Sequence, residues 1–339
     1  MLRKIISFVL HRRLEDVLAA GFSLALLAIF LSGRVSRTIQ ISGHDVAFVL
    51  LPVGVLGLKC LFELLLAPEA DGRENLDVGK YLAIFFQPLA RIFRDWFPFV
   101  LLSACYYAMY SNFMFHLNPR TADAVLARFD AALLGSQPSF LLEKWITPWA
   151  TDFCNFVYFS YVLSLPIVAF YCYTRREKTV FRRVMMGYLT LMLMGITSYL
   201  CMPAIGPGTF FSDRYTQDLS GHAISRGVDF IIRNGRVAYD CFPSLHVGIP
   251  LLLCFYLRDY QRKLFIPAIL YVLAMCCTVI YLRYHYLADV LAAFAFAPAA
   301  YWLNDFMLAR WPGERILATS KPTPKDAVLA DADPSGRTA

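Results

Sequence analysis

Long apolar runs recur along this chain, and they constrain its fold more than any other feature. Most of them reach the length of about twenty residues that a helix needs to cross a bilayer. Hydrophobic residues make up 58% of the chain and charged residues only 17%, which is too apolar for an ordinary soluble domain. The sequence therefore predicts an all-α integral membrane protein with about eight transmembrane helices. The runs cover residues 17–33, 46–66, 97–116, 151–173, 184–203, 246–257, 264–283 and 286–308.

These runs divide the chain into three regions. Residues 1–80 are predicted to form an N-terminal membrane region of two helices, and residues 81–310 a domain of six spans. Residues 311–339 are rich in Pro, Ala, Asp and Ser, so we expect a disordered cytoplasmic tail. Tyr81–Trp96 is predicted to be a helix lying on the bilayer surface. Residues 117–147 are predicted to form an outer segment with apolar residues at amphipathic spacing, including Leu126, Phe129, Leu133 and Leu134.

Basic residues in short loops set the expected orientation, because Lys and Arg are retained on the cytoplasmic side. In a chain of eight spans the three basic clusters fall on one side, which places both termini in the cytoplasm and residues 204–243 on the outer face. We attribute the net charge of +7 to these clusters, which would contact anionic lipid headgroups. The expected partner is therefore a membrane, and no nucleic-acid partner is expected. The clusters are Arg3, Lys4, Arg12 and Arg13; Arg175, Arg176, Lys178, Arg182 and Arg183; and Arg258, Arg262 and Lys263.

Three smaller features each have two interpretations. The first run, which ends near Leu31-Ser32-Gly33, is taken as a retained helix rather than a signal peptide, since cleavage would spoil the charge pattern. Lys59 and Glu63, one helical turn apart within a run, are taken as an internal ion pair rather than a functional relay. Cys201 and Cys241 both approach the outer face, and two unlinked packing cysteines are preferred to a disulfide.

His285 and Asp289 stand four residues apart where the last run begins. On a helix this spacing places both side chains on one face, so Asp289 is expected to hold one imidazole nitrogen and leave the other facing outward. A histidine held in this way is a better nucleophile or base, because the carboxylate stabilises the cation that forms. The pair alone is weak evidence, since many helices carry one by chance.

The sequence Cys241-Phe242-Pro243-Ser244-Leu245-His246 leads into the sixth run, which starts at His246. Pro243 is expected in the first turn of a helix, where unpaired backbone N–H groups and the helix dipole favour an anion. The Ser244 hydroxyl would add a donor to that site. His246 is placed to protonate a leaving oxygen, and we expect it to lie across a polar cavity from His285.

These two motifs resemble those of the type 2 phosphatidic acid phosphatase superfamily. Within it, the chain is most similar to the inositolphosphotransferase branch, which includes inositol phosphorylceramide synthase. The family's Pro-Ser-x-His and His-x-x-x-Asp elements match residues 243–246 and 285–289. The pattern Asp130, Gly135, Pro138 and the turn Pro203-Ala204-Ile205-Gly206-Pro207 also look like that branch. The resemblance covers roughly residues 97–308, so the six-span domain would be the catalytic domain.

By this resemblance the protein would be a lipid-phosphate phosphotransferase or phosphatase. The distribution of basic residues places its site at the outer face of the cell membrane. His285 would attack phosphorus to form a phosphohistidine, Asp289 would orient His285, and His246 would protonate the departing alkoxide. The substrate would be a phospholipid, a sphingolipid or a polyprenyl phosphate, and water, a polyol or another alcohol would accept the phosphoryl group. The family implies no metal and no other cofactor.

The chain departs from the family pattern in its phosphate-binding cations. Phosphatase members place an Arg six residues before the nucleophilic His, where this chain has Val279, with Thr278 in the adjacent Ser position. The upstream basic motif is not evident, and the turn continues Pro207-Gly208-Thr209 without its Arg. Phosphate-binding cations must therefore come from elsewhere, and the candidates are Arg283, Arg214 and Arg236. Arg283 is equally well interpreted as an interfacial anchor beside Tyr281 and Tyr284.

Two other functions compete with this one. A transporter or channel would carry polar residues near the middle of several spans, but here they lie mostly at the ends. A metal site would use His246, His285 and Asp289, with His222 or Asp240 as a candidate further ligand. These ligand types are acceptable, but no tight ligand spacing beyond the i, i+4 pair supports a metal.

Overall fold

The computed structural model describes residues 13–31, 92–103, 106, 118, 120–174, 178–235 and 239–311. Every regular element in these ranges is a helix, and the only strand-like feature among them is an isolated bridge between Ala204 and Asp240. Four helical stretches here are long and apolar enough to cross a membrane: α8 (Pro148–Thr174), α9 (Lys178–Cys201), Arg262–Tyr281 and α14 (Leu287–Arg310). The predicted all-α membrane fold is confirmed.

The four long stretches match predicted runs, and the remaining runs have different outcomes. The run at 246–257 is α12 (Leu245–Tyr260), which at 16 residues is shorter than the others. The first run is α2 (Leu14–Leu31). The run at 46–66, with Lys59 and Glu63, lies outside the described residues, as does the tail from residue 312.

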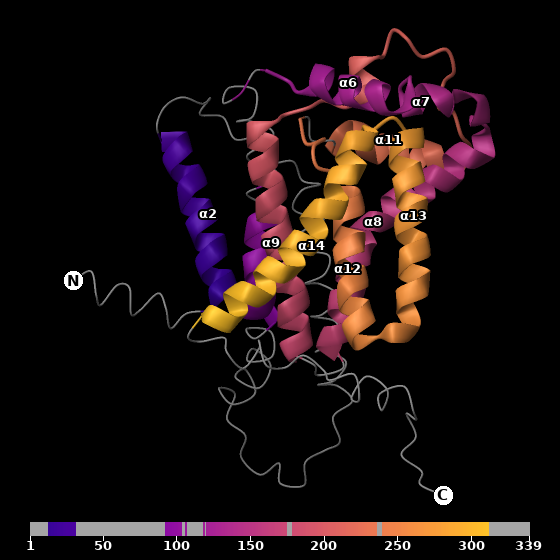
Figure 1. Cartoon of the computed structure of the whole chain (residues 1–339). Coiled ribbons are helices and arrows are strands. Elements are labelled where there is room, and N and C mark those ends of the chain that lie inside the picture. The colour runs from indigo at the N-terminus through magenta and orange to yellow at the C-terminus, as the bar shows by residue number, and fades with distance from the viewer. Residues whose placement is uncertain are drawn as a thin grey trace, which may run out of the picture.

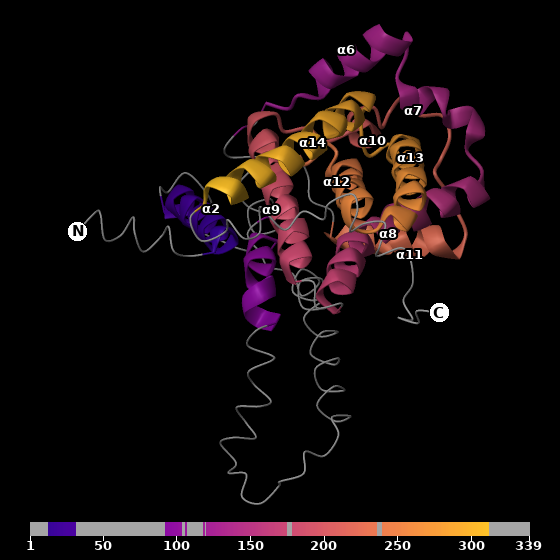
Figure 2. The same cartoon turned by 60° about the horizontal axis from the view of Figure 1, so that its bottom comes forward.

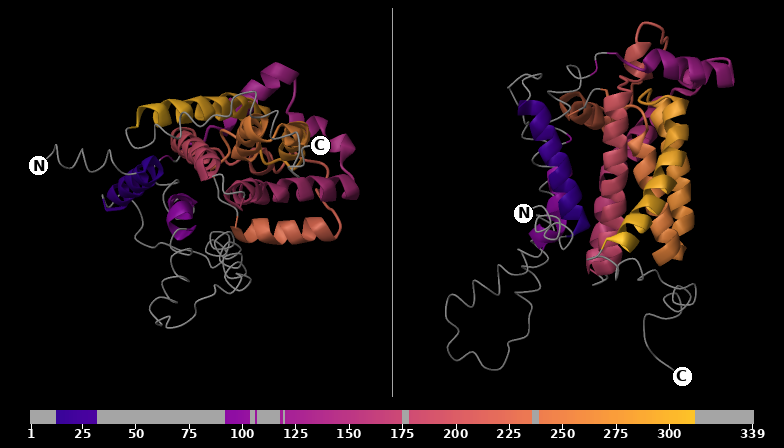
Figure 3. Two further views of the ribbon diagram at one scale, coloured as in Figure 1. Left: turned by 90° about the horizontal axis from the view of Figure 1, so that it is seen from below. Right: turned by 60° about the vertical axis from the view of Figure 1, so that its left-hand side comes forward.

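The helices of the second half form one bundle. In Figure 1, α8, α9, α12 and α13 (Phe265–Tyr281) stand side by side, while α14 crosses α9 and α12 obliquely. Figure 3 shows the same layers from below and from the side, with α2 at the edge of the bundle next to α9. Successive helices run in opposite directions, so α9 ends where α12 and α14 begin. This end of the bundle, the upper end in Figure 1, is called the histidine end below because it carries His246 and His285.

One helix crosses a boundary that the sequence placed at Trp96. Residues 92–103 form one continuous helix across this boundary. The reason is a continuous buried face: Ile92, Trp96, Phe99 and Leu102 recur at helical spacing and are all at most 5% exposed. Residues 81–91 lie outside the described part of the chain.

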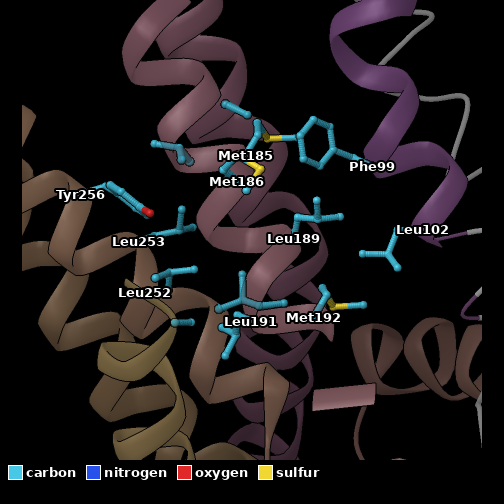
Figure 4. Close-up of a cluster of buried hydrophobic side chains, with 14 of the residues drawn as sticks. Phe99, Leu102, Met185, Met186, Leu189, Leu191, Met192, Leu252, Leu253 and Tyr256 are labelled. Carbon is cyan, nitrogen blue, oxygen red and sulfur yellow. The ribbon is translucent and has the colours of Figure 1, made fainter. Parts of the chain in front are cut away.

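The centre of the bundle is packed around α9. Figure 4 shows Met185, Met186, Leu189 and Met192 of α9 between side chains of α12 and of the helix at 92–103. Lipid tails are as apolar as these side chains, so close van der Waals packing rather than the hydrophobic effect holds such helices together.

A glycine allows the closest approach within this bundle. A Cβ atom at Gly187 would lie 2.0 Å from the hydroxyl of Tyr256, so only glycine allows α12 to pack here. The Tyr256 hydroxyl in turn accepts a hydrogen bond from Asn304 of α14 at 2.9 Å. Three helices are thereby fixed at one point.

Short helices cover the histidine end. They are α6 (Asp123–Leu134), α7 (Pro138–Leu141), η1 (Glu143–Trp145), α10 (Pro207–Phe210) and α11 (Ala223–Gly235). Figure 2, in which the bottom of the molecule is turned toward the viewer, shows α6 and α7 extending beyond the ends of the long helices. Because these segments lie at the ends of α9, α12 and α14, they are placed to shape whatever site those ends form.

The segment predicted to lie outside the membrane contains the helices α6 and α7, but its buried face is not the expected one. Of the four apolar residues at amphipathic spacing only Leu126 is buried, whereas Phe129, Leu133 and Leu134 are about half exposed. The buried face of α6 instead carries two carboxylates, Asp123 and Asp130, each fully buried. A buried carboxylate must be satisfied by donors, so the face was selected by hydrogen bonding and not by hydrophobicity.

Candidate active site

His285 lies just before a helix, not within one. Helix α14 begins at Leu287, with Tyr286 as its N-cap. The predicted contact between His285 and Asp289 is confirmed, but the expectation that both residues lie on one helix face is wrong. The two side chains meet because Asp289, in the first turn, folds back: its Oδ2 accepts the backbone N–H of Tyr286 at 2.8 Å and lies 3.3 Å from Nδ1 of His285.

The protonation of His285 follows from its neighbours. Its Nδ1 lies 2.9 Å from the backbone oxygen of Cys241, closer than it lies to Asp289. A carbonyl oxygen can only accept, so Nδ1 must carry the proton. In the neutral ring the lone pair then sits on Nε2. The residue is 3% exposed, so this orientation is held by the protein.

His246 faces that lone pair. It is the second residue of α12, and its Nδ1 lies 3.2 Å from Nε2 of His285. Its ring stacks on Tyr158 and contacts Tyr161 at a tilt, both on α8, with ring centres 4.6 and 4.5 Å away. The expectation of a polar cavity between the two histidines is wrong, because the rings are in direct contact. Tertiary packing of α8 against α12 decides this distance.

Ser244 supplies an unused donor beside the histidines. It is the N-cap of α12, so Pro243 precedes the helix and the prediction that Pro243 lies in the first turn is wrong. The peptide bond before Pro243 is cis, and the Pro243 carbonyl accepts a hydrogen bond from Tyr199 at 3.0 Å. The Ser244 hydroxyl is fully buried and has no hydrogen-bond partner among the described residues. Such a hydroxyl, at a helix N-terminus, is suited to an anion.

Cys241 belongs to the same cluster, although the sequence suggested only packing. Its thiol is 2.9 Å from Oδ2 of Asp289 and 3.5 Å from Nδ1 of His285. Burial, followed by the Asp289 carboxylate, raises the pKa of this thiol well above its ordinary value, so it remains protonated and donates. It is free, as is Cys201, which confirms the two unlinked cysteines. Its position two residues before Pro243 is the sequence feature that could have identified it.

The buried carboxylates of α6 hold the histidine segment in place. Asp130 accepts the backbone N–H groups of Leu287 and Ala288, at 2.8 and 2.9 Å. Those are orphan donors at the start of α14, which a distant side chain here satisfies. Burial raises the pKa of Asp130, and the two N–H groups oppose that rise. Asp130 was noted in the sequence only as part of a family pattern, and its role as a cap depends on the fold.

Asp123 ties the same segment to the turn after α9. It accepts the Tyr286 hydroxyl at 3.0 Å and the backbone N–H groups of Ile205 and Gly206. Gly206 has φ of +84°, and a Cβ atom there would lie 2.6 Å from the Tyr284 carbonyl oxygen. The glycine in this turn is therefore required by close contact with the backbone next to His285.

Arg283 is buried in an ion pair rather than exposed. Its guanidinium lies 3.1 Å from Glu143, donates to the Gln217 carbonyl at 2.6 Å and stacks 3.7 Å from the ring centre of Tyr215. Burial lowers the pKa of Arg283, whereas Tyr215 and Glu143 raise it. One nitrogen, Nε, is buried without a partner among the described residues. The side chain is only 10% exposed, which does not fit an anchor in the interface.

The other candidate residues are dispersed. Arg214 is exposed and lies 5.5 Å from the ring centre of Phe211, while Arg236 is outside the described residues. His222 pairs with Asp152 at 3.1 Å, where the start of α11 meets α8. Asp240 accepts the Tyr106 hydroxyl at 2.7 Å. Of the residues considered as metal ligands, the structure thus gives His222 and Asp240 other partners.

A different set could hold a metal. In the described part of the chain, ligand atoms of Cys241, His285 and Asp289 lie within 4.8 Å of one another. The Cys241 thiol would have to lose its proton to act as a ligand, against the raised pKa that burial and Asp289 produce. The arrangement is therefore better suited to holding an imidazole proton than to binding a metal.

Comparison with known proteins identifies the family. No curated protein and no solved structure matches the chain at a significant level. The protein-family model described as PAP2 superfamily matches residues 124–303, more than half of the chain. This range begins in α6, ends in α14 and contains both histidine motifs. Its members are phosphatases and phosphotransferases. The chain belongs to the PAP2 superfamily.

Proposed function

We propose that the protein transfers a phosphoryl group from a lipid phosphate through a phosphohistidine on His285. The observation that carries the proposal is the fixed tautomer of this residue. The Cys241 carbonyl and Asp289 hold the proton on Nδ1, at 2.9 and 3.3 Å, which leaves the Nε2 lone pair as the nucleophile. Asp289 stabilises the positive charge that grows on the ring as the bond to phosphorus forms.

The first step requires the two histidines to separate. Nε2 of His285 is covered by Nδ1 of His246 at 3.2 Å, so phosphorus can approach only when His246 gives way. The Nε2–P bond then forms as the bond between phosphorus and the lipid oxygen breaks. His246, displaced by the width of the phosphoryl group, lies beside the departing oxygen and donates its proton to it. Water or an alcohol reverses these roles and frees His285.

The phosphate would be held by the start of α12 together with basic residues. The buried Ser244 hydroxyl and the first N–H groups of the helix supply donors without a charge. Arg283, Arg214 and Arg236 remain the proposed cations. Arg283 would need to turn its free Nε toward the phosphate, because its terminal nitrogen is bound to Glu143 and Gln217.

The proposal also covers the acceptor of the phosphoryl group and the class of lipid substrate. The similarity of the motifs to the inositolphosphotransferase branch favours a polyol or another alcohol as acceptor, with water as the alternative. The lipid would be a phospholipid, a sphingolipid or a polyprenyl phosphate. A six-span catalytic domain at residues 81–310, with a two-helix region before it, is part of the same proposal.

The proposed location is the outer face of the cell membrane. Two described parts of the chain support it: the histidines lie where α9 ends, and the basic residues Lys178, Arg182 and Arg183 lie where α9 begins. Basic residues are retained in the cytoplasm, so the histidines would face outward. Labelling of single-cysteine variants in intact cells tests this, and outside labelling at Lys178 would reverse the orientation.

The decisive experiment is transfer of radiolabelled phosphate from a panel of lipid phosphates by the purified protein, with and without alcohols. His285→Ala should abolish both turnover and the trapped phosphoenzyme. His246→Ala should still form the phosphoenzyme from a lipid analogue whose leaving group needs no proton. Full activity of His285→Ala would refute the proposal, and a transporter would show substrate flux without any phosphoenzyme.

A further inference from the structure

A cavity lies at the opposite end of the bundle from the histidines. Its volume is about 130 Å³, and it opens between the starts of α2 and α9 and the helix at 92–103. The right-hand view of Figure 3 shows these three helix ends close together at the lower end of the helix bundle. Helix α9 spans 24 residues, so the cavity is about 36 Å from the histidine end. It is lined by Arg13, Arg94, Asp95, Lys178, Phe181 and Arg182.

The carboxylates near the cavity are shared between basic side chains. Glu15, 1% exposed, binds both Arg13 and Arg182, with N–O distances of 2.5 and 2.9 Å. Asp95 binds Arg13 at 2.8 Å and Arg94 at 3.4 Å. These contacts hold the guanidinium groups of Arg13 and Arg182 in fixed directions around the cavity, which is how an anion site is preorganised.

Two of the lining side chains have donors to spare. The Arg94 side chain is 65% exposed, and its one ion pair among the described residues is the 3.4 Å contact with Asp95. Lys178 is exposed and has no ion-pair partner among the described residues. Four basic side chains line the cavity. Three carboxylates lie near them, namely Glu15, Asp16 and Asp95. Positive charge among these described residues is therefore in excess.

The backbone adds to this positive potential. Lys178, Phe181 and Arg182 belong to the first turns of α9, where unpaired N–H groups and the helix dipole favour an anion. Because α9 is long and apolar enough to cross the bilayer, its first turn lies at the membrane boundary, at the depth of lipid headgroups. Basic pockets between helices at this depth are suited to anionic headgroups.

We propose that this cavity binds the phosphate group of an anionic membrane lipid, at a site separate from the histidines. The lipid is held by Arg94 and Lys178, with Arg13 and Arg182 behind them, while its acyl chains remain in the bilayer beside α2 and α9. The site takes a phosphodiester headgroup and does no chemistry on it. Binding joins α2 and the helix at 92–103 to α9 through one shared anion.

The test is native mass spectrometry of the full-length protein in detergent with phosphatidylglycerol, phosphatidylcholine or inorganic phosphate. The wild type should retain phosphatidylglycerol in preference to phosphatidylcholine. The double variant Arg94→Gln, Lys178→Gln should lose this preference by roughly ten-fold or more, since two donors are removed. The matched control is Arg262→Gln, Lys263→Gln, which removes the same charge from the turn before α13 at the same end of the bundle. The control should keep the preference.

The outcomes separate the possible explanations. Equal retention of phosphatidylglycerol by the Arg94→Gln, Lys178→Gln variant and the wild type would overturn the proposal. An equal loss in this variant and in the control would also overturn it, because general surface charge and not the cavity would then explain the preference. A third outcome is that inorganic phosphate binds through Arg94 and Lys178 while phosphatidylglycerol is retained no better than phosphatidylcholine. The ligand of the cavity would then be free phosphate and not a lipid headgroup. Both altered residues are exposed, and unchanged thermal unfolding without lipid confirms that the variant is folded. His285→Ala should still bind the lipid, because the site is independent of the proposed function.

Discussion

Asp289→Asn tests whether the carboxylate acts through charge or through geometry. Asparagine can still accept the Tyr286 N–H with its oxygen, and the Cys241 carbonyl still holds the proton on Nδ1 of His285 at 2.9 Å. The substitution therefore removes the negative charge 3.3 Å from the imidazole and leaves the tautomer in place. At an effective dielectric constant of ~20, two unit charges at this separation interact by about 5 kcal/mol.

The imidazole carries only part of a charge in the transition state, so part of this energy is lost. A loss of about 3–4 kcal/mol corresponds to a fall in kcat of roughly 10²–10³-fold. The rate of phosphoenzyme formation should fall by the same factor in rapid-quench measurements with a radiolabelled short-chain phosphatidic acid. The apparent KM should change little, because the carboxylate does not touch the lipid.

The matched control is Asp152→Asn. It alters another aspartate that contacts a histidine, His222 at 3.1 Å, on α8 and away from His285. It should leave phosphoenzyme formation within a few-fold of the wild type. If Asp289→Asn slows the step by less than about three-fold, the charge argument is wrong and the Cys241 carbonyl alone orients the histidine.

Further predictions concern the residues around the histidines. Asp130→Ala should lower the free energy of unfolding by about 2–4 kcal/mol and reduce activity, because two buried N–H groups lose their acceptor; thermal unfolding in detergent measures this, and an unchanged midpoint would contradict it. Cys241 should react with iodoacetamide far more slowly than the exposed Cys201, since burial raises the pKa of its thiol and leaves little thiolate at neutral pH; peptide mass spectrometry compares them. If Arg283 binds phosphate, Glu143→Gln should lower the apparent KM by freeing the guanidinium, whereas Arg283→Ala should raise it; a loss of stability in both variants with no change in KM would make the pair structural. Chelation of divalent metals should leave turnover unchanged, and loss of activity that zinc restores would favour a metal site.

The sequence determined the class of fold and the location of the candidate site residues along the chain. Apolar length alone predicts spanning helices, because the bilayer fixes how many residues a helix needs. Proline and serine before His246 predict a helix start, since the cap is a local interaction. These inferences depend on neighbouring residues only, and the structure agrees with them to within two residues at the start of α12.

Only the tertiary structure decided which groups surround the histidines. The carbonyl that holds His285 comes from Cys241, 44 residues earlier, and the cap of α14 comes from Asp130, 158 residues before Ala288. A backbone carbonyl is present at every residue, so no sequence pattern distinguishes the one that will face an imidazole. Likewise, the polar face of α6 is buried because the start of α14 offers unsatisfied donors there, a fact that depends on how the helices pack and not on the order of their residues.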